Sequence, residues 1–390
     1  MTAIKIVHTA DNHLDPTFQK FKGKTNERRR DFRINFERIV KFCLDNKVDV
    51  LLLCGDVFDR INPRNPPRSN LMKWFRDLTS NGTRIFMIGG NHDMPRSVEE
   101  AESPLLLFER SGYARFFGST EEVETENLKI GDISLTISGL SFNHNYSISD
   151  DPLSNVRIPE EGDFNILMLH YTITGVKQKY PYALEPKVNV SEIPKYVNYV
   201  AAGHLHKQET KVLGNTVIAY PGSTEKLTFD EAEDEKGFYF IELEDNLVPK
   251  QTFIKLETRP MQRISLEVNS TNEKDIQNYV QNEVLKLKNE NLILRVDLKG
   301  RVSFQAFQYY NKVELLRNLE KYFFLLEIND ADLMLKEEGN EASYADKTPI
   351  EFFYEFIRQK ISEEKDEERK KMLEEALFYL DSKLKEVSQQ

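Results

Sequence analysis

Short apolar runs, each followed by polar residues, recur through the N-terminal half of the chain. The runs at Ile4–Ala10, Val50–Cys54 and Ile85–Ile88 have the length and composition of buried strands. Between the first two runs, Arg28–Asn46 places its apolar residues at helical spacing. This β-α-β order predicts adjacent parallel strands that are joined by a right-handed crossover.

The alternation of strand-like apolar runs with helical or polar segments continues towards residue 258. We expect helices at about Ser69–Leu78 and near Val98–Arg110, whose apolar patches pack into the core or, as an alternative, form a dimer seam. Further apolar strands are expected at Ile166–His170 and Val197–His206, and both end on histidine. The sequence therefore predicts a two-sheet α/β domain, flanked by helices, over residues 1–258.

The remainder of the chain divides by pattern into three parts. Strands and helices alternate over residues 259–335, which predicts a small α/β domain. Residues 336–347 are acidic and poorly periodic, so we interpret them as a linker. Residues 348–390 begin with Thr348-Pro349, a helix start signal, and form charged amphipathic helices that need a surface on which to dock.

Composition excludes several protein classes. The chain of 390 residues is 39% hydrophobic and 30% charged, as in ordinary globular proteins. No apolar run approaches the ~20 residues that span a bilayer, and the N-terminus shows no signal-peptide pattern. We therefore expect a cytoplasmic protein without membrane segments, in which Cys43 and Cys54 are buried and reduced.

Charge is unevenly distributed along the chain. The net charge of −11 argues against a nucleic-acid partner, but residues 1–80 hold sixteen Lys/Arg against ten Asp/Glu. A cluster of basic residues in this region is either a solvated helix face or a surface for phosphate groups. The candidates for DNA binding are Lys20, Lys22, Lys24, Arg28, Arg29, Arg30, Arg64 and Arg68.

Five of the seven histidines follow predicted strands, which is the strongest chemical signal in the sequence. They are His13, His92, His170, His204 and His206, and they are accompanied by Asp11, Asp56 and Asn91. A single histidine of this kind is more often structural, but the carboxyl ends of strands in α/β sheets are where ligand sites form. Imidazole and carboxylate without thiolate suit Mn²⁺, Fe²⁺ or Zn²⁺. Asp56 is the candidate bridge between two such ions.

The order and spacing of these motifs resemble a known family. D-x-H, GD-x-x-D, GNHD, a strand-end histidine and GH-x-H follow one another as in the calcineurin-like metallophosphoesterase superfamily. Within it, the chain resembles the SbcD-type nuclease subunits of double-strand-break repair complexes, through HTADNHL, RRRDFRINF and YPGSTEKLTFDEAEDEKGFYFIEL. The resemblance implies a two-sheet metallophosphoesterase sandwich, an α/β capping domain on the DNA-binding side and a helical tail that grips a partner.

The resemblance also implies roles for the site residues. One metal would be bound by Asp11, His13 and His206, the other by Asn91, His170 and His204, and Asp56 would bridge them. His92 would act at the scissile phosphate rather than bind metal; in an alternative interpretation it only orients Asp93. Many family members have histidine where this chain has Asp59, so the role of that position in handling duplex ends is open.

The implied function is a Mn²⁺-dependent DNA exonuclease and endonuclease with two Mn²⁺ per subunit. It would act on duplex ends, hairpins and single strands, as a homodimer, with an SMC-like coiled-coil ATPase, in association with the nucleoid. An alternative within the superfamily is a phosphomonoesterase or cyclic-nucleotide phosphodiesterase. A metal-stabilised scaffold without catalysis is a third possibility, but it would be expected to lack some of the ligands, and none is missing.

Overall fold

A computed structural model describes residues 3–18, 21, 23–97, 101–177, 185–244, 246–269, 271–336, 349–363, 366, 369–375 and 377. By contacts, the chain forms two compact units. The first contains residues 1–266, 281–297 and 312–329, and the second contains residues 267–280, 298–311 and 330–390. The division falls inside strands of one small sheet, whereas the predicted domain boundaries at 258, 335 and 347 stay predictions.

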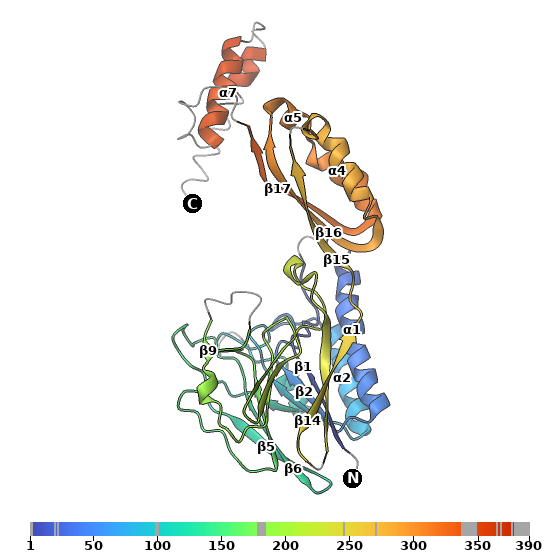
Figure 1. Ribbon diagram of the computed structural model, residues 1–390, viewed down its shortest axis with the longest axis vertical. Helices are drawn as coiled ribbons and strands as arrows, with labels where there is room; N and C mark the ends of the chain where they lie inside the picture. Colours follow the sequence, from blue (N-terminus) through green and yellow to red (C-terminus); the bar gives the residue numbers. More distant parts are fainter. Residues whose placement is uncertain are drawn as a thin grey trace. The chain divides into compact units, whose positions relative to one another are not determined.

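Two six-stranded sheets form the bulk of the first unit (Figure 1). The first has the order β14-β13-β1-β2-β3-β4 and the second the order β11-β12-β10-β7-β6-β5. The strands of the first are β1 (Ile4–Thr9), β2 (Val50–Cys54), β3 (Arg84–Ile88), β4 (Arg115–Phe117), β13 (Lys236–Leu243) and β14 (Pro249–Leu256). Those of the second are β5 (Glu124–Ile130), β6 (Ile133–Leu140), β7 (Phe164–Leu169), β10 (Tyr199–Ala202), β11 (Glu209–Leu213) and β12 (Thr216–Tyr220).

Each sheet has a parallel centre. In the first sheet β1, β2, β3 and β4 are parallel neighbours, and in the second β6, β7, β10 and β12 are parallel neighbours. Buried side chains such as Leu52 and Phe86 of the first sheet share one core with Ile166 and Ala201 of the second. The predicted two-sheet α/β fold is confirmed.

Helices cover the outer face of the first sheet. These are helix α1 (Thr25–Asn46) and helix α2 (Asn65–Ser80), which lie beside the sheet in Figure 1. They pack Phe36 and Phe75 against the side chains of Val7 and Leu51 in β1 and β2. Strand β2 is buried along its whole length because this layer covers one face and the second sheet covers the other.

Helix boundaries differ from the prediction at two places. Helix α2 begins at Asn65 rather than near Ser69, because two prolines occupy its first turn, where their missing N–H groups need no partner. The helix expected near Val98–Arg110 is only α3 (Leu106–Arg110). In the preceding segment the Ser103 hydroxyl accepts a hydrogen bond from the Leu105 amide and donates one to the Asp93 carbonyl, which favours a turn; residues 98–100 lie outside the described part.

The smaller elements are as follows. Strands β15 (Met261–Val268), β16 (Asn289–Val302) and β17 (Phe323–Leu335) form a three-stranded sheet, with helices α4 (Ile276–Leu285), α5 (Phe304–Tyr309) and α6 (Lys312–Leu319) between them. Strands β8 (Thr172–Ile173) and β9 (Lys187–Val188) pair with each other. Short 3₁₀ turns are η2 (Val190–Glu192), η3 (Phe229–Glu231), η4 (Glu273–Asp275) and η5 (Glu320–Tyr322).

The C-terminal segment is described only in part. Helix α7 (Pro349–Glu363) begins at the predicted proline, and residues 369–375 are also helical. Most of the predicted linker, residues 337–347, lies outside the described residues, as do Leu380 and Leu384 of the predicted second amphipathic helix. Among the described helices, none has the length and apolar character of a membrane span.

Candidate metal centre

The strand ends of both sheets meet at one place. Strand β1 leads into Asp11 and His13, β2 into Asp56, and β3 into Asn91 and His92. In the second sheet β7 leads directly into His170, and β10 leads into His204 and His206. Each of these strands is parallel to its neighbour in its own sheet, so their carboxyl ends lie at a common edge, as the sequence predicted.

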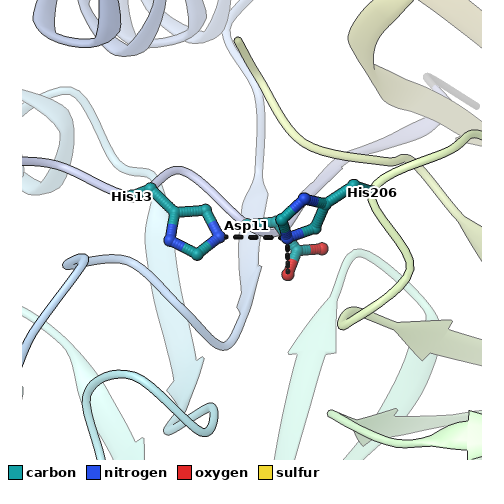
Figure 2. A group of neighbouring side chains, drawn as sticks. All are labelled: Asp11, His13 and His206. Atoms are coloured by element: carbon teal, nitrogen blue, oxygen red, sulfur yellow. Dashed lines mark hydrogen bonds and ion pairs between the residues drawn. The ribbon is translucent and has the colours of Figure 1, made fainter. Parts of the chain in front are cut away.

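Three side chains from both sheets form one donor group (Figure 2). His13 Nε2 lies 3.2 Å from His206 Nε2, and His206 Nε2 lies 4.0 Å from Asp11 Oδ1. Asp11 and His13 are fully buried, and the His206 ring is largely buried. Figure 2 shows the two imidazoles facing each other beside the Asp11 carboxylate.

A second donor group lies around Asn91. Its Oδ1 is 3.2 Å from His170 Nε2 and also 3.2 Å from His204 Nδ1. His170 and His204 extend from the second sheet, and Asn91 from the first. One ring nitrogen of each histidine therefore lies within 3.2 Å of the same amide oxygen.

Asp56 lies between these two groups. Its Oδ2 is 3.8 Å from His13 Nε2 and 3.4 Å from His170 Nε2, so one carboxylate reaches a member of each group. Burial acts to raise the pKa of Asp56, but His170 and His13 outweigh it and hold that pKa well below its ordinary value. Asp56 is therefore a carboxylate in the position that a bridging ligand requires.

The backbone is specialised for this approach. The backbone φ angle is positive, between 43° and 88°, at Asp11, His13, Asp56 and His204. Residues other than glycine rarely adopt this conformation. Such conformations persist only where the surrounding structure enforces them, and they concentrate at functional sites. The loops are therefore shaped to bring donor atoms together at the expense of local backbone energy.

The ring nitrogen facing away from the centre lies near an oxygen atom in all four histidines of the two donor groups, and in His170 and His206 it donates a hydrogen bond to that oxygen. His170 Nδ1 donates to the Cys54 carbonyl oxygen at 2.8 Å, and His13 Nδ1 lies 3.2 Å from Asp59 Oδ1. His204 Nε2 lies 2.5 Å from Glu185 Oε2, and His206 Nδ1 is hydrogen-bonded at 3.2 Å to Glu231 Oε1. The hydrogen bonds of His170 and His206 are of the kind that fixes the tautomer of a metal-binding histidine and orients its ring.

Sequence reasoning found Asp59 but missed Glu185 and Glu231. Neither glutamate belongs to a strand-end motif: Glu185 precedes β9 and Glu231 ends η3. Glu231 lies inside the segment YPGSTEKLTFDEAEDEKGFYFIEL that supported the resemblance, so that segment contained the only available signal.

The donor set fits divalent metal ions. In His170 and His206, Nδ1 donates to an oxygen outside the centre, so Nε2 is the nitrogen that faces the centre and would bind a metal ion in place of a proton. Burial opposes protonation of His170, but Asp56 outweighs it and raises the pKa of His170 to about 10, so the cluster strongly favours positive charge. Nitrogen and oxygen donors without sulfur suit Mn²⁺, Fe²⁺ or Zn²⁺, the ions expected from the sequence.

His92 stands at the rim. Its ring packs edge-on to His13 with centroids 4.8 Å apart, and Nδ1 donates to the Asp59 carbonyl oxygen at 2.9 Å. The backbone N–H of His92 donates to Asp56 Oδ1 at 2.8 Å. His92 also lines a cavity of about 560 Å³ together with Asn91, Arg60 and Tyr146. Nε2 of His92 is therefore the nitrogen available to a molecule in that cavity.

Asp93 is a buried brace of the loops. Its carboxylate accepts hydrogen bonds from the backbone amides of Gly90 at 2.7 Å, Val57 at 2.8 Å and Phe58 at 3.3 Å. Burial, followed by the nearby Asp56 charge, raises the pKa of Asp93 to about 7. The side chain thus ties the loop after β3 to the loop after β2.

The basic residues predicted as candidates for DNA binding differ in how far their side chains are exposed. Arg28 is fully buried, packs over the Phe32 ring and binds Asp31 and Glu225 through its guanidinium. The prediction that Arg28 contacts DNA is therefore wrong, because its charge is enclosed in the protein. Lys24 donates to the carbonyls of Phe323 and Phe324.

The other basic candidates lie at the surface or outside the described part. Arg30 and Arg64 are exposed, while Arg29 and Arg68 are half-buried. Lys20 and Lys22 lie outside the described residues. Arg29 and Arg64 both contact Asp15, a buried carboxylate two residues after His13.

Comparisons with known proteins agree with this geometry. The family model described as calcineurin-like phosphoesterase matches residues 4–208, which include every histidine of the site. The chain belongs to the calcineurin-like phosphoesterase family.

Relatives within the family include repair proteins. The chain is 25% identical to the DNA double-strand break repair protein Mre11 of Sulfolobus acidocaldarius, over 86% of this chain and 85% of that protein. It is 29% identical to the Mre11 protein of Methanocaldococcus jannaschii, over 74% and 75% of the two chains. It is also 26% identical to the uncharacterized metallophosphoesterase YhaO of Bacillus subtilis, over 62% and 58%. The predicted resemblance is confirmed at the level of the family and of its Mre11-type members.

Proposed function

We propose that this protein is a metal-dependent DNA nuclease that hydrolyses phosphodiester bonds with two Mn²⁺ ions per subunit, with Fe²⁺ or Zn²⁺ as alternatives. The observation that supports it best is the position of Asp56 between two donor groups, in a chain related to Mre11 proteins. Asp11, His13 and His206 would hold one ion, and Asn91, His170 and His204 the other. A pair of such ions supplies Lewis acidity and an activated water.

The protein's own residues would position the substrate and the proton. His92 is held by the Asp59 carbonyl through Nδ1, so Nε2 can meet a phosphoryl oxygen or the departing oxygen of a substrate in the adjoining cavity. The Asp59 carboxylate, 3.2 Å from His13 Nδ1, would attract that ring and help to orient it.

A cluster of arginines beside the centre would bind DNA phosphates. Asp15 Oδ1 lies 2.7 Å from Arg64 Nη2 and 3.3 Å from Arg29 Nε, and Asp15 Oδ2 lies 3.6 Å from Arg60 Nη2. Three guanidinium groups thus share one buried carboxylate, which leaves an excess of positive charge in a chain that is acidic overall. Clustered arginine charge is the electrostatic feature that recognises a phosphate backbone.

The remaining assignments extend the proposal to the whole chain. Residues 259–335 would cap the DNA-binding side, and residues 348–390 would dock on an SMC-like coiled-coil ATPase. The protein would act as a homodimer in the cytoplasm, associated with the nucleoid, on duplex ends, hairpins and single strands. These assignments rest on the resemblance to SbcD-type nuclease subunits, and the relatives' names support only the role in double-strand break repair.

One experiment separates the proposal from the other activities of the superfamily. The purified protein is incubated with Mn²⁺ and, in parallel, with linear duplex DNA, single-stranded DNA, a cyclic nucleotide and p-nitrophenyl phosphate. We expect Mn²⁺-dependent DNA cleavage that EDTA stops. Turnover restricted to the monoester or the cyclic nucleotide would instead establish the phosphomonoesterase or cyclic-nucleotide phosphodiesterase alternative.

A further inference from the structure

A buried lysine–glutamate pair lies directly behind His206. Glu231 Oε2 is 2.6 Å from Lys236 Nζ, and the side chains are 3% and 0% exposed. Glu231 Oε1 accepts the hydrogen bond from His206 Nδ1 at 3.2 Å. The pair is therefore connected to the donor group of Asp11 and His13 through a single imidazole.

The contacts of this pair are nearly saturated. Lys236 Nζ also donates to the His206 carbonyl oxygen at 2.7 Å and to Ser223 Oγ at 2.8 Å. Thr228 Oγ1 donates to Glu231 Oε1 at 3.1 Å. Lys236 thus holds the backbone of His206 while Glu231 holds its ring, so the pair fixes both ends of one residue.

The location of the pair explains why such a brace is needed. His206 follows β10 of the second sheet, whereas Lys236 begins β13 of the first sheet, and Glu231 lies on the connection between them. A charged pair taken out of water is expensive, and replacing it with apolar residues of similar size is often neutral or stabilising. Stability alone therefore gives no reason for this pair, whereas orientation of His206 does.

We propose that Glu231, held by Lys236, is a positioning residue that fixes Nε2 of His206 as the nitrogen that binds metal. With Nδ1 donating to Glu231, the lone pair of Nε2 is directed to the side where His13 Nε2 and Asp11 lie. This inference rests on the metal centre of the proposed function. Removing the hydrogen-bond partner of a metal-binding histidine typically lowers metal affinity by about 10- to 100-fold.

The test compares two double variants that carry no buried charge at this place. E231Q/K236M keeps an oxygen that can accept from His206 Nδ1, and E231M/K236M has a side chain of similar length without an acceptor. Each protein is treated with EDTA and titrated with Mn²⁺, and free Mn²⁺ is followed by electron paramagnetic resonance. No substrate or turnover is involved.

We expect the wild type to bind two Mn²⁺. Both double variants lack Lys236, so the acceptor is tested by comparing them with each other. E231M/K236M should bind one of the two ions about 10- to 100-fold more weakly than E231Q/K236M, and the other ion equally well. E231D serves as a second variant, because it keeps the charge against Lys236 but withdraws the carboxylate by one methylene. E231D should likewise bind one Mn²⁺ ion more weakly than the wild type does. The positioning role can therefore be tested even if E231M/K236M does not fold.

The control is Glu235→Gln, four residues after Glu231. It removes an exposed ion pair with Lys255 and should leave the affinities for both Mn²⁺ ions unchanged. Equal affinities in E231Q/K236M and E231M/K236M, or wild-type affinity in E231D, would overturn the positioning role while leaving the nuclease proposal intact. A wild type that binds no Mn²⁺ would instead overturn the proposed function on which this inference rests.

Discussion

Gly90 lies against Asp56 so closely that a Cβ atom on Gly90 would stand 2.2 Å from Asp56 Oδ1 and 2.6 Å from the Asp56 backbone nitrogen. The position of Asp56 between the two donor groups therefore depends on the absence of a side chain at Gly90 on the neighbouring loop. The contact joins the loop after β3 to the loop after β2, where Asp93 also ties them together.

Gly90→Ala should consequently displace Asp56 and weaken Mn²⁺ binding by at least about tenfold, since the ligand shifts away from both ions. Isothermal titration with Mn²⁺ measures the effect. Gly82→Ala is the matched control: Gly82 has positive φ but open space around a Cβ, so backbone strain should lower stability without changing metal affinity. Equal affinity in wild type and Gly90→Ala would show that Asp56 does not bridge.

His92→Ala should retain two metal ions and lose cleavage by about 10²- to 10⁴-fold, because a group acting on the substrate is removed while the donor groups stay in place. Asn91→Ala, one residue earlier, should lose metal and activity together. Metal content by plasma mass spectrometry, measured beside DNA cleavage, distinguishes the two. A fall in metal content in His92→Ala would make His92 a ligand.

Arg64→Gln should weaken DNA binding and reduce the slope of log affinity against log salt by about 1, because one phosphate contact is lost. Fluorescence anisotropy with a labelled duplex over a range of salt concentrations measures this slope. Arg76→Gln at the other end of α2 removes an exposed pair with Asp77 and should leave the slope unchanged. An unaltered slope in Arg64→Gln would remove the arginine cluster from the DNA interface.

Asp297 should make stability depend on pH in the acid range. Burial acts to raise its pKa, but hydrogen bonds from Arg263, Asn329 and Arg295 outweigh it and lower the pKa of Asp297 to about 2. Because the folded pKa lies below the unfolded value, the stabilisation is complete above about pH 4 and is lost as pH falls towards 2.

Asp297→Asn should therefore be less stable than the wild type by about 1–2 kcal/mol at pH 7, with a difference that shrinks between pH 4 and pH 2. Urea unfolding followed by circular dichroism at several pH values tests this. Asp132→Asn, at an exposed turn, controls for the loss of one negative charge. A difference independent of pH would mean that the hydrogen bonds do not depend on ionised Asp297.

Removal of all residues after 347 should abolish binding of the proposed ATPase partner. The proposed Mn²⁺-dependent nuclease activity should remain, because the donor groups and the arginine cluster all lie before residue 207. Pull-down with the coiled-coil ATPase, beside a nuclease assay of the same preparation, measures both properties. Undiminished partner binding would place the docking surface elsewhere in the chain.

The strand-end motifs were predictable because the apolar pattern of a strand is local and β-α-β order predicts parallel neighbours, whose carboxyl ends lie at one edge of a sheet. Asp11, Asp56 and His170 could be placed in this way. Glu231 could not, since the contact with His206 depends on how η3 folds between the two sheets. Local pattern also failed for Arg28, which belongs to a basic run but turns inward because Glu225 is buried beside it.

Both donor groups draw on both sheets: Asp11 and His13 from the first meet His206 from the second, and Asn91 from the first meets His170 and His204 from the second. An ion in either group would therefore act as a crosslink between the two halves of the sandwich. Binding to the folded chain alone adds about 2.7 kcal/mol at a free metal concentration one hundred times the Kd. The melting temperature of this protein should accordingly rise with metal concentration and report occupancy in the absence of any substrate.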